Sequence, residues 1–161
     1  MKRTDLVVVT DRGGHLHNAR MLCDQMTLRP DVWLLTAGPE VSELRKLGHR
    51  VAVLPYLFSW IGKRRVWNPL RFLFQSLLAL GHALWLRPRH VVSLGASDVV
   101  PFCYWARLFG ARVFHVECMN QVQSPSVTGR LLYPVCEVLY VQWPELLRHY
   151  GAKARYAGWV L

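Results

Sequence analysis

Short, strongly apolar runs alternate along the chain with longer stretches in which apolar residues recur at helical spacing. The short runs are rich in valine and leucine, a pattern that predicts strands buried on both faces of a sheet. They lie at Leu6–Thr10, Asp31–Thr36, Val51–Leu54, His90–Leu94, Arg112–Val116 and Val138–Gln142. The stretches between them predict helices at His15–Leu28, Pro39–Leu47, Asn68–Leu86, Asp98–Phe109, Ser126–Val135 and Pro144–Tyr150. Because such alternation is typical of a parallel sheet covered by helices, the sequence predicts one α/β domain over residues 1–161.

Proline and glycine mark the expected ends of several helices. Pro39, Pro69 and Pro144 each stand where a first helical turn is expected, a position that tolerates the missing N–H group. Gly48 and Gly110 follow expected helix ends, where a residue in the left-handed conformation commonly closes the helix. These signals support the assignment of helices, and the pattern suggests no internal domain boundary.

Positive charge is concentrated in the middle of the chain. The formal net charge is +10, and no aspartate or glutamate occurs between Glu43 and Asp98. Basic residues in that stretch are Arg45, Lys46, Arg50, Lys63, Arg64, Arg65, Arg71, Arg87 and Arg89. Such a surface attracts polyanions, which include nucleic acids, anionic lipid headgroups and phosphorylated substrates. Nucleic-acid binding is not expected, because no nucleic-acid-binding module is recognisable and the aromatic residues cluster in an apolar helix instead of a stacking platform.

The four cysteines indicate neither a metal site nor a redox motif. Cys23, Cys103, Cys118 and Cys136 are widely spaced, and no pair has C-x-x-C spacing. That spacing argues against a zinc site and a thioredoxin-type centre, so we expect no bound metal and no cofactor. Most of these cysteines are expected to be small buried apolar groups in a protein from a reducing compartment.

The segment Tyr56–Arg89 departs from the regular spacing of strands and helices. Its apolar run spans only about fifteen residues and includes Gln75 and His82, whereas a bilayer-crossing helix needs roughly twenty apolar residues. Two interpretations stay open: a crossover helix packed on the sheet, or a patch that contacts a membrane surface through aromatic and basic side chains. The absence of carboxylates favours the membrane patch, because a solvated helix face mixes both signs of charge. Its predicted contact residues are Trp60, Lys63, Arg64, Arg65, Trp67, Phe72 and Phe74.

A glycine-rich turn follows the first predicted strand. In the sequence Asp11-Arg-Gly-Gly-His15, Gly13 and Gly14 let the backbone approach a ligand closely, and N–H groups at the following helix start favour anions. The turn matches neither the dinucleotide fingerprint G-x-G-x-x-G nor a P-loop. His15 could serve as a general base or as a donor to phosphate. The alternative is a plain tight turn in which His15 is only a polar residue at the helix start.

Two later loops follow predicted strands and are expected at the same edge of the sheet. In the first, Gly95 leaves room for a substrate, while Ser97 is either part of that site or, like Asp98, a cap for the next helix. In the second, Glu117 precedes Asn120. A carboxylate here is either an ion-pair partner within the fold or an acid–base group.

In chain order these motifs resemble the acceptor subunit of split glycosyltransferases, of the PssD type in bacteria and of the asparagine-linked glycosylation pathway in eukaryotes. Both are similar to the N-terminal half of MurG. The resemblance rests on Gly13-Gly14-His15, on Gly95–Asp98 with Pro101, on Phe114–Glu117 with Asn120, on Ser126–Pro134, on Tyr140–Leu146 and on Tyr156–Gly158. It implies a Rossmann-like fold with helices on both faces, the N-terminal domain of a GT-B enzyme.

The resemblance also implies an activity and its partners. We expect an inverting, metal-independent transfer from a UDP-sugar, the co-substrate, to a polyprenyl-pyrophosphate-linked sugar. A separate GT-B C-terminal-domain chain would supply most of the nucleotide-sugar site. Gly13, Gly14 and His15 would face the acceptor pyrophosphate, and either His15 or Glu117 would deprotonate the acceptor hydroxyl, with Asn120 matching the amide position of the later loop. The main alternative is a non-catalytic membrane adaptor that recruits the catalytic chain.

The sequence departs from the family pattern in two ways, and the second bears on where the protein is expected to be located. Asp11 and Arg12 stand where the family usually has a glycine- or serine-containing segment. The N-terminal transmembrane anchor usual in the eukaryotic subunit is not expected, so membrane contact would come from Tyr56–Arg89 or from another protein. We therefore expect a peripheral protein on the cytoplasmic face of the cell membrane, in contact with anionic lipid.

Overall fold

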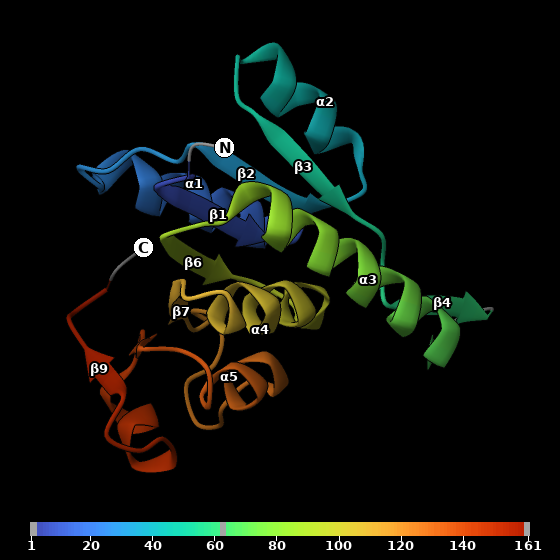
Figure 1. The fold of residues 1–161 in the computed structure, drawn as a ribbon. Helices are drawn as coiled ribbons and strands as arrows, with labels where there is room; N and C mark the ends of the chain where they lie inside the picture. Colours follow the sequence, from blue (N-terminus) through green and yellow to red (C-terminus); the bar gives the residue numbers. More distant parts are fainter. Residues whose placement is uncertain (1–2, 62–63, 160–161) are drawn as a thin grey trace.

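A parallel sheet organises the chain. The structure, a computed structural model, describes residues 3–61 and 64–159, and for residues 58–61 and 64–67 it describes the backbone alone. Seven strands pair in the order β3-β2-β1-β6-β7-β8-β9, and every neighbouring pair is parallel (Figure 1). They are β1 (Leu6–Thr10), β2 (Val32–Thr36), β3 (Val51–Leu54), β6 (His90–Leu94), β7 (Arg112–Val116), β8 (Val138–Val141) and β9 (Ala154–Tyr156). The predicted parallel α/β fold is confirmed.

Helices cover both faces of this sheet and enclose two apolar cores. The helices are α1 (Gly14–Gln25), α2 (Pro39–Lys46), α3 (Pro69–Leu86), α4 (Val100–Leu108) and α5 (Val127–Leu132). Buried residues of α3, α4 and α5 pack with one set of strand side chains, and those of α1 and α2 pack with the opposite set. The strands alternate their side chains between these two cores, which explains why each run is almost wholly apolar.

The strand order places a crevice between two central strands. The chain proceeds outward from β1 to β2 and β3, and it then returns to β6 on the other side of β1. Loops leaving β1 and β6 therefore diverge to opposite faces at the carboxyl edge of the sheet. Ligands of open α/β sheets bind at such a topological switch point.

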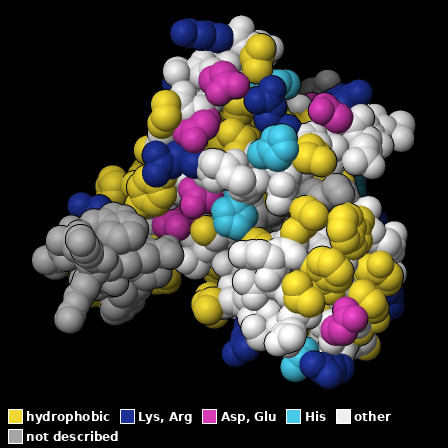
Figure 2. All heavy atoms as spheres, turned by 180° about the vertical axis from the view of Figure 1, so that it is seen from behind, with side chains coloured by type: hydrophobic (Ala, Val, Ile, Leu, Met, Phe, Trp, Pro, Cys, Tyr) yellow, Lys and Arg dark blue, Asp and Glu magenta, His cyan; other side chains and the backbone are white. Residues whose placement is uncertain are grey.

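One part of the sheet is incompletely covered. On the face of α1 and α2, the side chains of Phe114 and Tyr140 are only partly buried, and they border a hollow of about 580 Å³ with Met26 and Trp159. Figure 2 shows hydrophobic side chains gathered on the half of this face nearest the C-terminal strands. The fold thus leaves apolar sheet surface over β7 and β8.

A two-stranded hairpin projects from the carboxyl edge of the sheet, and the sequence did not predict it. Strands β4 (Phe58–Ile61) and β5 (Arg64–Trp67) pair antiparallel between β3 and α3 (Figure 1). Their mixture of basic and bulky residues has no clear alternation, and they pair only with each other, so the hydrophobic pattern carried no strand signal. Of the predicted membrane-contact residues, Lys63 and the side chains of Trp60, Arg64, Arg65 and Trp67 lie outside the described residues.

Several predicted helices are shorter than expected. The predicted helix Asp98–Phe109 is a 3₁₀ turn, η1 (Ser97–Val99), followed by α4, and the last predicted helix is a 3₁₀ helix, η2 (Pro144–His149). A capping role for Ser97 or Asp98 was wrong, because neither η1 nor α4 has a side-chain cap. The Asp98 carboxylate instead accepts a hydrogen bond from the Leu57 backbone at 2.7 Å, which ties the turn to the segment after β3.

The long helix α3 is buried along one face, as a crossover helix requires, and exposed along the other, and its contact with a membrane stays a prediction. Asn68 caps it by accepting hydrogen bonds from two backbone N–H groups, and Pro69 occupies its first position as predicted. One face, with Gln75 and Ala79, packs on the sheet. The opposite face exposes a row of large apolar side chains: Leu70, Phe72, Leu73, Phe74, Leu77, Leu78, Leu84 and Trp85. Within residues 3–61 and 64–159, no helix is both long enough and apolar enough to cross a bilayer.

Candidate functional site

Three loops meet at the switch point between β1 and β6. A small hollow there is lined by His15 from the start of α1, Gly95 after β6, and Glu117 and Cys118 after β7. Asn18, one turn along α1 from His15, completes the wall with two strand residues. The structure brings together His15 and Glu117, as expected for residues that follow parallel strands of one sheet. Sequence reasoning did not single out Asn18 or Cys118, although Asn18 is three residues from His15 and so on the same helix face.

The glycine turn presents open backbone at this crevice. Gly13 has φ of 62° and ψ of −130°, a conformation that residues with a Cβ rarely adopt. It precedes α1 without any side-chain cap, and both Gly13 and Gly14 are exposed, with no atom within 4 Å of a Cβ added at either position. The start of α1 therefore presents exposed glycine backbone, where the helix dipole favours an anion.

The two glycines give a matched pair of substitutions with different expected results. Gly13→Ala should lower the free energy of unfolding by about 1–2 kcal/mol, because alanine resists the positive φ. Gly14→Ala adds the same methyl group at a position without positive φ, so stability should be unchanged or slightly higher. Denaturant unfolding of both variants would measure this. Equal stability losses would contradict the conformational assignment of Gly13.

Asp11 and Arg12, the departures from the family pattern, both contact neighbouring strand ends. The Thr36 hydroxyl, at the end of β2, donates a hydrogen bond to the Asp11 carboxylate. The Arg12 guanidinium lies 4.8 Å from the centre of the Tyr56 ring, within cation–π distance. These contacts fix the base of the glycine turn, which explains their presence without a role in ligand contact.

Gly95 is required by the close approach of two loops. A Cβ at this buried position would lie 3.0 Å from the Asp11 backbone nitrogen and 3.4 Å from Thr10 Cα. The loop after β6 therefore packs directly on the loop after β1. Any larger residue would displace the glycine turn. Ser97 is half-buried in the η1 turn and does not line the hollow.

The His15 side chain contacts a residue from across the crevice. Its Nδ1 lies 3.6 Å from Cys118 Sγ. Burial, and secondarily the nearby Glu117 carboxylate, raise the pKa of the Cys118 thiol to about 11, so the group stays protonated at neutral pH. The imidazole is half-buried, which leaves it accessible from the crevice.

Glu117 is wholly buried and its carboxylate accepts three hydrogen bonds. Oε1 accepts from the Cys118 backbone at 3.1 Å, and Oε2 accepts from the Ser126 backbone at 3.3 Å and from the Tyr150 hydroxyl. Burial, then the hydrogen bond to Glu117, raise the pKa of Tyr150. A Cβ at Gly129 would collide with the Tyr150 hydroxyl and the Glu117 carboxylate. The carboxylate thus joins β7, α5 and the segment after η2.

His115 lies beside this carboxylate on β7 and is fully buried. Its Nδ1 is 3.3 Å from Ser93 Oγ, and its Nε2 has no hydrogen-bond partner. Burial lowers the pKa of His115 to about 4 from 6.5, although the Glu117 charge opposes the shift. The folded protein therefore holds this imidazole neutral, because an imidazolium would be desolvated there.

Acid should destabilise the fold through His115. The unfolded chain protonates this residue near pH 6.5 and the folded chain only near pH 4, so the unfolded state binds more protons between these values. The stabilisation is complete above about pH 6.5 and declines as the pH falls to about 4, by on the order of 3 kcal/mol. Denaturant unfolding across this range would measure it. A His115→Gln variant with the same pH dependence would contradict the assignment.

Asn120 and Trp143 belong to the loop beyond the hollow. Asn120 is exposed and does not line the hollow with His15. The Trp143 indole donates a hydrogen bond of 2.7 Å to the Met119 carbonyl and packs edge-on against Trp159. Trp143 therefore fixes the loop that carries Asn120.

The cysteines and the other potential metal ligands form no metal site among the described residues. All four cysteines are free thiols, with Cys23, Cys103 and Cys136 buried as predicted. Within the part of the chain that the structure describes, no three histidine, cysteine or acidic side chains are grouped to hold a metal ion. Metal independence of any reaction stays a prediction.

Comparison with known proteins identifies several similar chains. Residues 61–160 match the family described as "Oligosaccharide biosynthesis protein Alg14 like". The protein named UDP-N-acetylglucosamine transferase subunit ALG14 is 33% identical over 91 residues in Eremothecium gossypii, covering 53% of this chain and 40% of that protein. In Homo sapiens the protein of that name is 30% identical over 91 residues, covering 48% of this chain and 42% of its own length. The match thus spans well under half the length of these relatives.

The fold also matches a solved structure. The crystal structure of Acinetobacter baumannii MurG superposes with a TM-score of 0.72 at 21% sequence identity. The superposition covers 93% of this chain and 44% of the MurG chain. The Rossmann-like architecture expected from the sequence is therefore shared with part of MurG.

Proposed function

The chain belongs to the Alg14-like family of oligosaccharide biosynthesis proteins, and from this premise we propose that it is the acceptor-binding, membrane-associated subunit of a two-chain glycosyltransferase. The enzyme transfers a sugar from a UDP-sugar to a polyprenyl-pyrophosphate-linked sugar. One observation carries the proposal: an uncapped helix start with open glycine backbone lies beside an accessible imidazole at the switch point of the sheet.

The acceptor pyrophosphate binds at the start of α1. Gly13 and Gly14 leave the backbone N–H groups of the first helical turn unobstructed, and these groups with the helix dipole attract the charged oxygens. Gly95 keeps the neighbouring loop close enough to support the turn. The anion-binding role thus needs no metal ion.

His15 acts as the general base. In the tautomer that carries its proton on Nδ1, which lies 3.6 Å from Cys118 Sγ, the other ring nitrogen can accept the proton of the acceptor hydroxyl. That hydroxyl oxygen then attacks the anomeric carbon of the donor, the bond from that carbon to the UDP oxygen breaks, and UDP departs with the bonding electrons. Glu117 is the weaker candidate for the base, because three donors already occupy its buried carboxylate.

The exposed face of α3 lies on the membrane surface. Phe72, Phe74 and their apolar neighbours enter the headgroup boundary, while Arg71 and Arg87 at the helix ends pair with anionic lipid. The glycine turn before α1 lies at the carboxyl edge of the sheet, the same edge at which α3 begins. This arrangement fits a peripheral protein on the cytoplasmic leaflet.

A partner chain supplies the nucleotide-sugar site. The MurG superposition accounts for 44% of that chain, and the names of the ALG14 relatives describe a subunit. The apolar surface over β7 and β8, with Phe114, Tyr140 and Trp159, offers a place for such a chain to dock. Burial of this hollow would complete the helix layer on that face of the sheet.

Reconstitution tests the proposal. The chain is co-expressed with a GT-B C-terminal-domain protein from the same genome, and the pair is supplied with a radiolabelled UDP-sugar and a polyprenyl-pyrophosphate-linked GlcNAc acceptor. We expect labelled lipid-linked product from the pair and none from either chain alone. Equal product from the partner alone would contradict a role in the transfer.

A further inference from the structure

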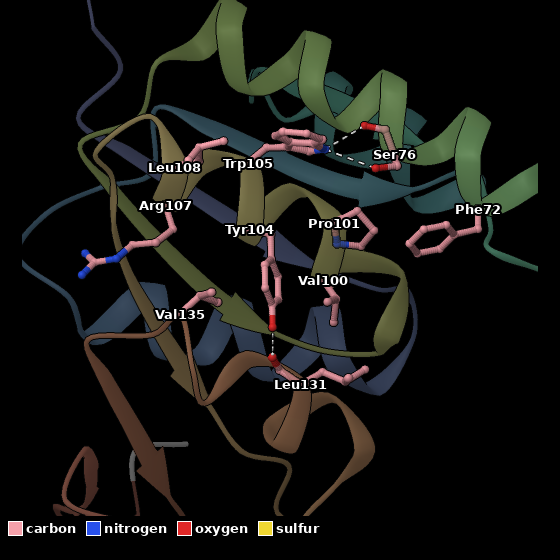
Figure 3. A pocket seen from close by; sticks show the side chains of 10 residues that line it. All are labelled: Phe72, Ser76, Val100, Pro101, Tyr104, Trp105, Arg107, Leu108, Leu131 and Val135. Carbon is pink, nitrogen blue, oxygen red and sulfur yellow. Dashed lines mark hydrogen bonds between the residues drawn. The ribbon is translucent and has the colours of Figure 1, made fainter.

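An apolar groove separates α3 from α4 and α5 on the opposite face of the sheet from α1. It has a volume of about 600 Å³, within the usual range for small-molecule sites. Its walls comprise Phe72 and Ser76 of α3, several residues of α4, and Leu131 and Val135 at and after α5. Figure 3 shows Phe72, Pro101 and Val100 at one end, with Leu108 and Arg107 at the other. Among the residues that the structure describes, no carboxylate lines this groove.

The polar groups in the walls are already paired within the protein. The Tyr104 hydroxyl donates to the Leu131 carbonyl at 2.8 Å, and the Trp105 indole donates to the Ser76 carbonyl and hydroxyl at 3.1 and 3.2 Å (Figure 3). Arg107 donates to the Ala111 carbonyl at 3.3 Å. A ligand in the groove therefore meets carbon almost everywhere, and groups that need hydrogen bonds would lose them on entry. The chemistry of the groove selects a hydrocarbon.

The groove starts next to the crevice that holds His15. Gly95 lines the crevice hollow and Val100 lines the groove, and the η1 turn connects these two residues along the chain. This turn is fixed on both sides, because the Asp98 carboxylate accepts from the Leu57 backbone and the Asp98 carbonyl accepts from the buried Gln75 side chain. Five residues span at most about 18 Å, so Gly95 at the crevice and Val100 at the groove lie within a distance that a few isoprene units can bridge.

We propose that this groove binds the first isoprene units of the acceptor's polyprenyl chain. The inference rests on the proposed function for the diphosphate site, and it adds that the protein recognises the lipid as well as its headgroup. With the diphosphate bound in the crevice, the attached isoprenoid chain extends over the η1 turn into the groove. There it displaces water from the apolar walls. The alternative occupant, an acyl chain of the surrounding membrane, has no link to the crevice.

Fluorescence of Trp105 in the groove wall tests the proposal without donor or vesicles. The contribution of Trp105 is the difference in fluorescence between the full chain and its Trp105→Phe variant. Binding at the crevice is measured separately, by competition with a labelled diphosphate. Probes below micellar concentration are geranylgeranyl diphosphate, isopentenyl diphosphate and palmitate. We expect geranylgeranyl diphosphate to change the Trp105 signal and to bind at least about tenfold more tightly than isopentenyl diphosphate. Palmitate should bind more weakly than geranylgeranyl diphosphate.

Two variants fill the groove and one matched control does not. Val100→Phe and Leu131→Phe narrow the groove from α4 and α5, and each should lower geranylgeranyl diphosphate affinity by at least about tenfold while leaving isopentenyl diphosphate affinity unchanged. Val127→Phe makes the same substitution at an exposed α5 position outside the groove, and it should leave both affinities unchanged. The second filling variant covers the case in which the first fails to fold.

The outcomes separate the groove from the diphosphate site. Equal affinities for the long and short diphosphates, or unchanged affinity in both filling variants, would overturn the groove assignment while the proposed function stands. Palmitate binding as tightly as geranylgeranyl diphosphate would overturn it in favour of membrane acyl chains. Failure of every diphosphate to bind would count against the proposed function itself.

Discussion

Replacing His15 by alanine should lower the turnover of sugar transfer by about 10²–10⁴-fold, the usual contribution of a general base. The substitution removes the imidazole that lines the crevice together with Gly95 and Glu117. The free energy of unfolding should change by less than about 0.5 kcal/mol, because the His15 side chain is half-buried and lies 3.6 Å from Cys118 Sγ. The rate is measured with the partner chain present and both substrates saturating, alongside denaturant unfolding.

The control for this prediction lies two residues further along the same helix. His17→Ala removes an exposed imidazole that does not line the hollow, and transfer should remain near that of the unmodified protein. A general base predicts a loss of kcat, whereas a donor to the acceptor diphosphate predicts a rise in the acceptor KM. Turnover near the unmodified level in His15→Ala, with partner binding intact, would favour the non-catalytic adaptor.

Replacing Glu117 by glutamine should lower the free energy of unfolding by on the order of 3 kcal/mol. The buried carboxylate accepts from the Cys118 and Ser126 backbones and from the Tyr150 hydroxyl. Glutamine offers one acceptor oxygen, and its amide N–H₂ would face groups that are themselves donors. Denaturant unfolding measures the change, and transfer should fall because the loop beside His15 loses its attachment to α5.

Two comparison variants test whether the effect of Glu117→Gln comes from the burial of the carboxylate and its hydrogen bonds or from the loss of a charge alone. Glu137→Gln changes a surface carboxylate that pairs with Arg112 at 2.6 Å, and its effect on the free energy of unfolding should be much smaller than that of Glu117→Gln. Tyr150→Phe removes one of the three donors to Glu117 and should cost about 1 kcal/mol. If Glu117→Gln were as stable as the unmodified protein yet inactive, the carboxylate would be the base in place of His15.

The chemistry of the crevice could be predicted only in part. That His15 and Glu117 share an edge follows from two strand patterns and the geometry of parallel sheets. The hydrogen bond from the Tyr150 hydroxyl to the Glu117 carboxylate could not be predicted, since the two residues are 33 positions apart. Gly95 was expected to make room for substrate, which stays a prediction, and its close packing on the Asp11 backbone could not be predicted from the sequence. Sequence motifs locate candidates, but the partners that decide their roles come from distant segments.

The surfaces were harder to predict than the site. The aromatic and apolar positions of α3 indicated a patch, yet the same pattern fits a buried crossover helix, and the structure has one face of each kind. The sequence of α4 alone does not predict a groove, because the Trp105 and Ser76 side of the groove forms only when α3 packs against α4. A groove is a space between elements, so no single periodic pattern encodes it.

The sequence by itself determined the elements and their alternation. Valine-rich runs, the Asn68-Pro69 start of α3 and the glycine turn before His15 act through local backbone preferences and side-chain periodicity, which a linear pattern contains. Tertiary structure alone decided the strand order, the burial of Glu117 and the groove between α3 and α4. These features depend on which apolar faces pack against each other when the faces are tens of residues apart in the sequence. The free energy of the whole core determines that packing.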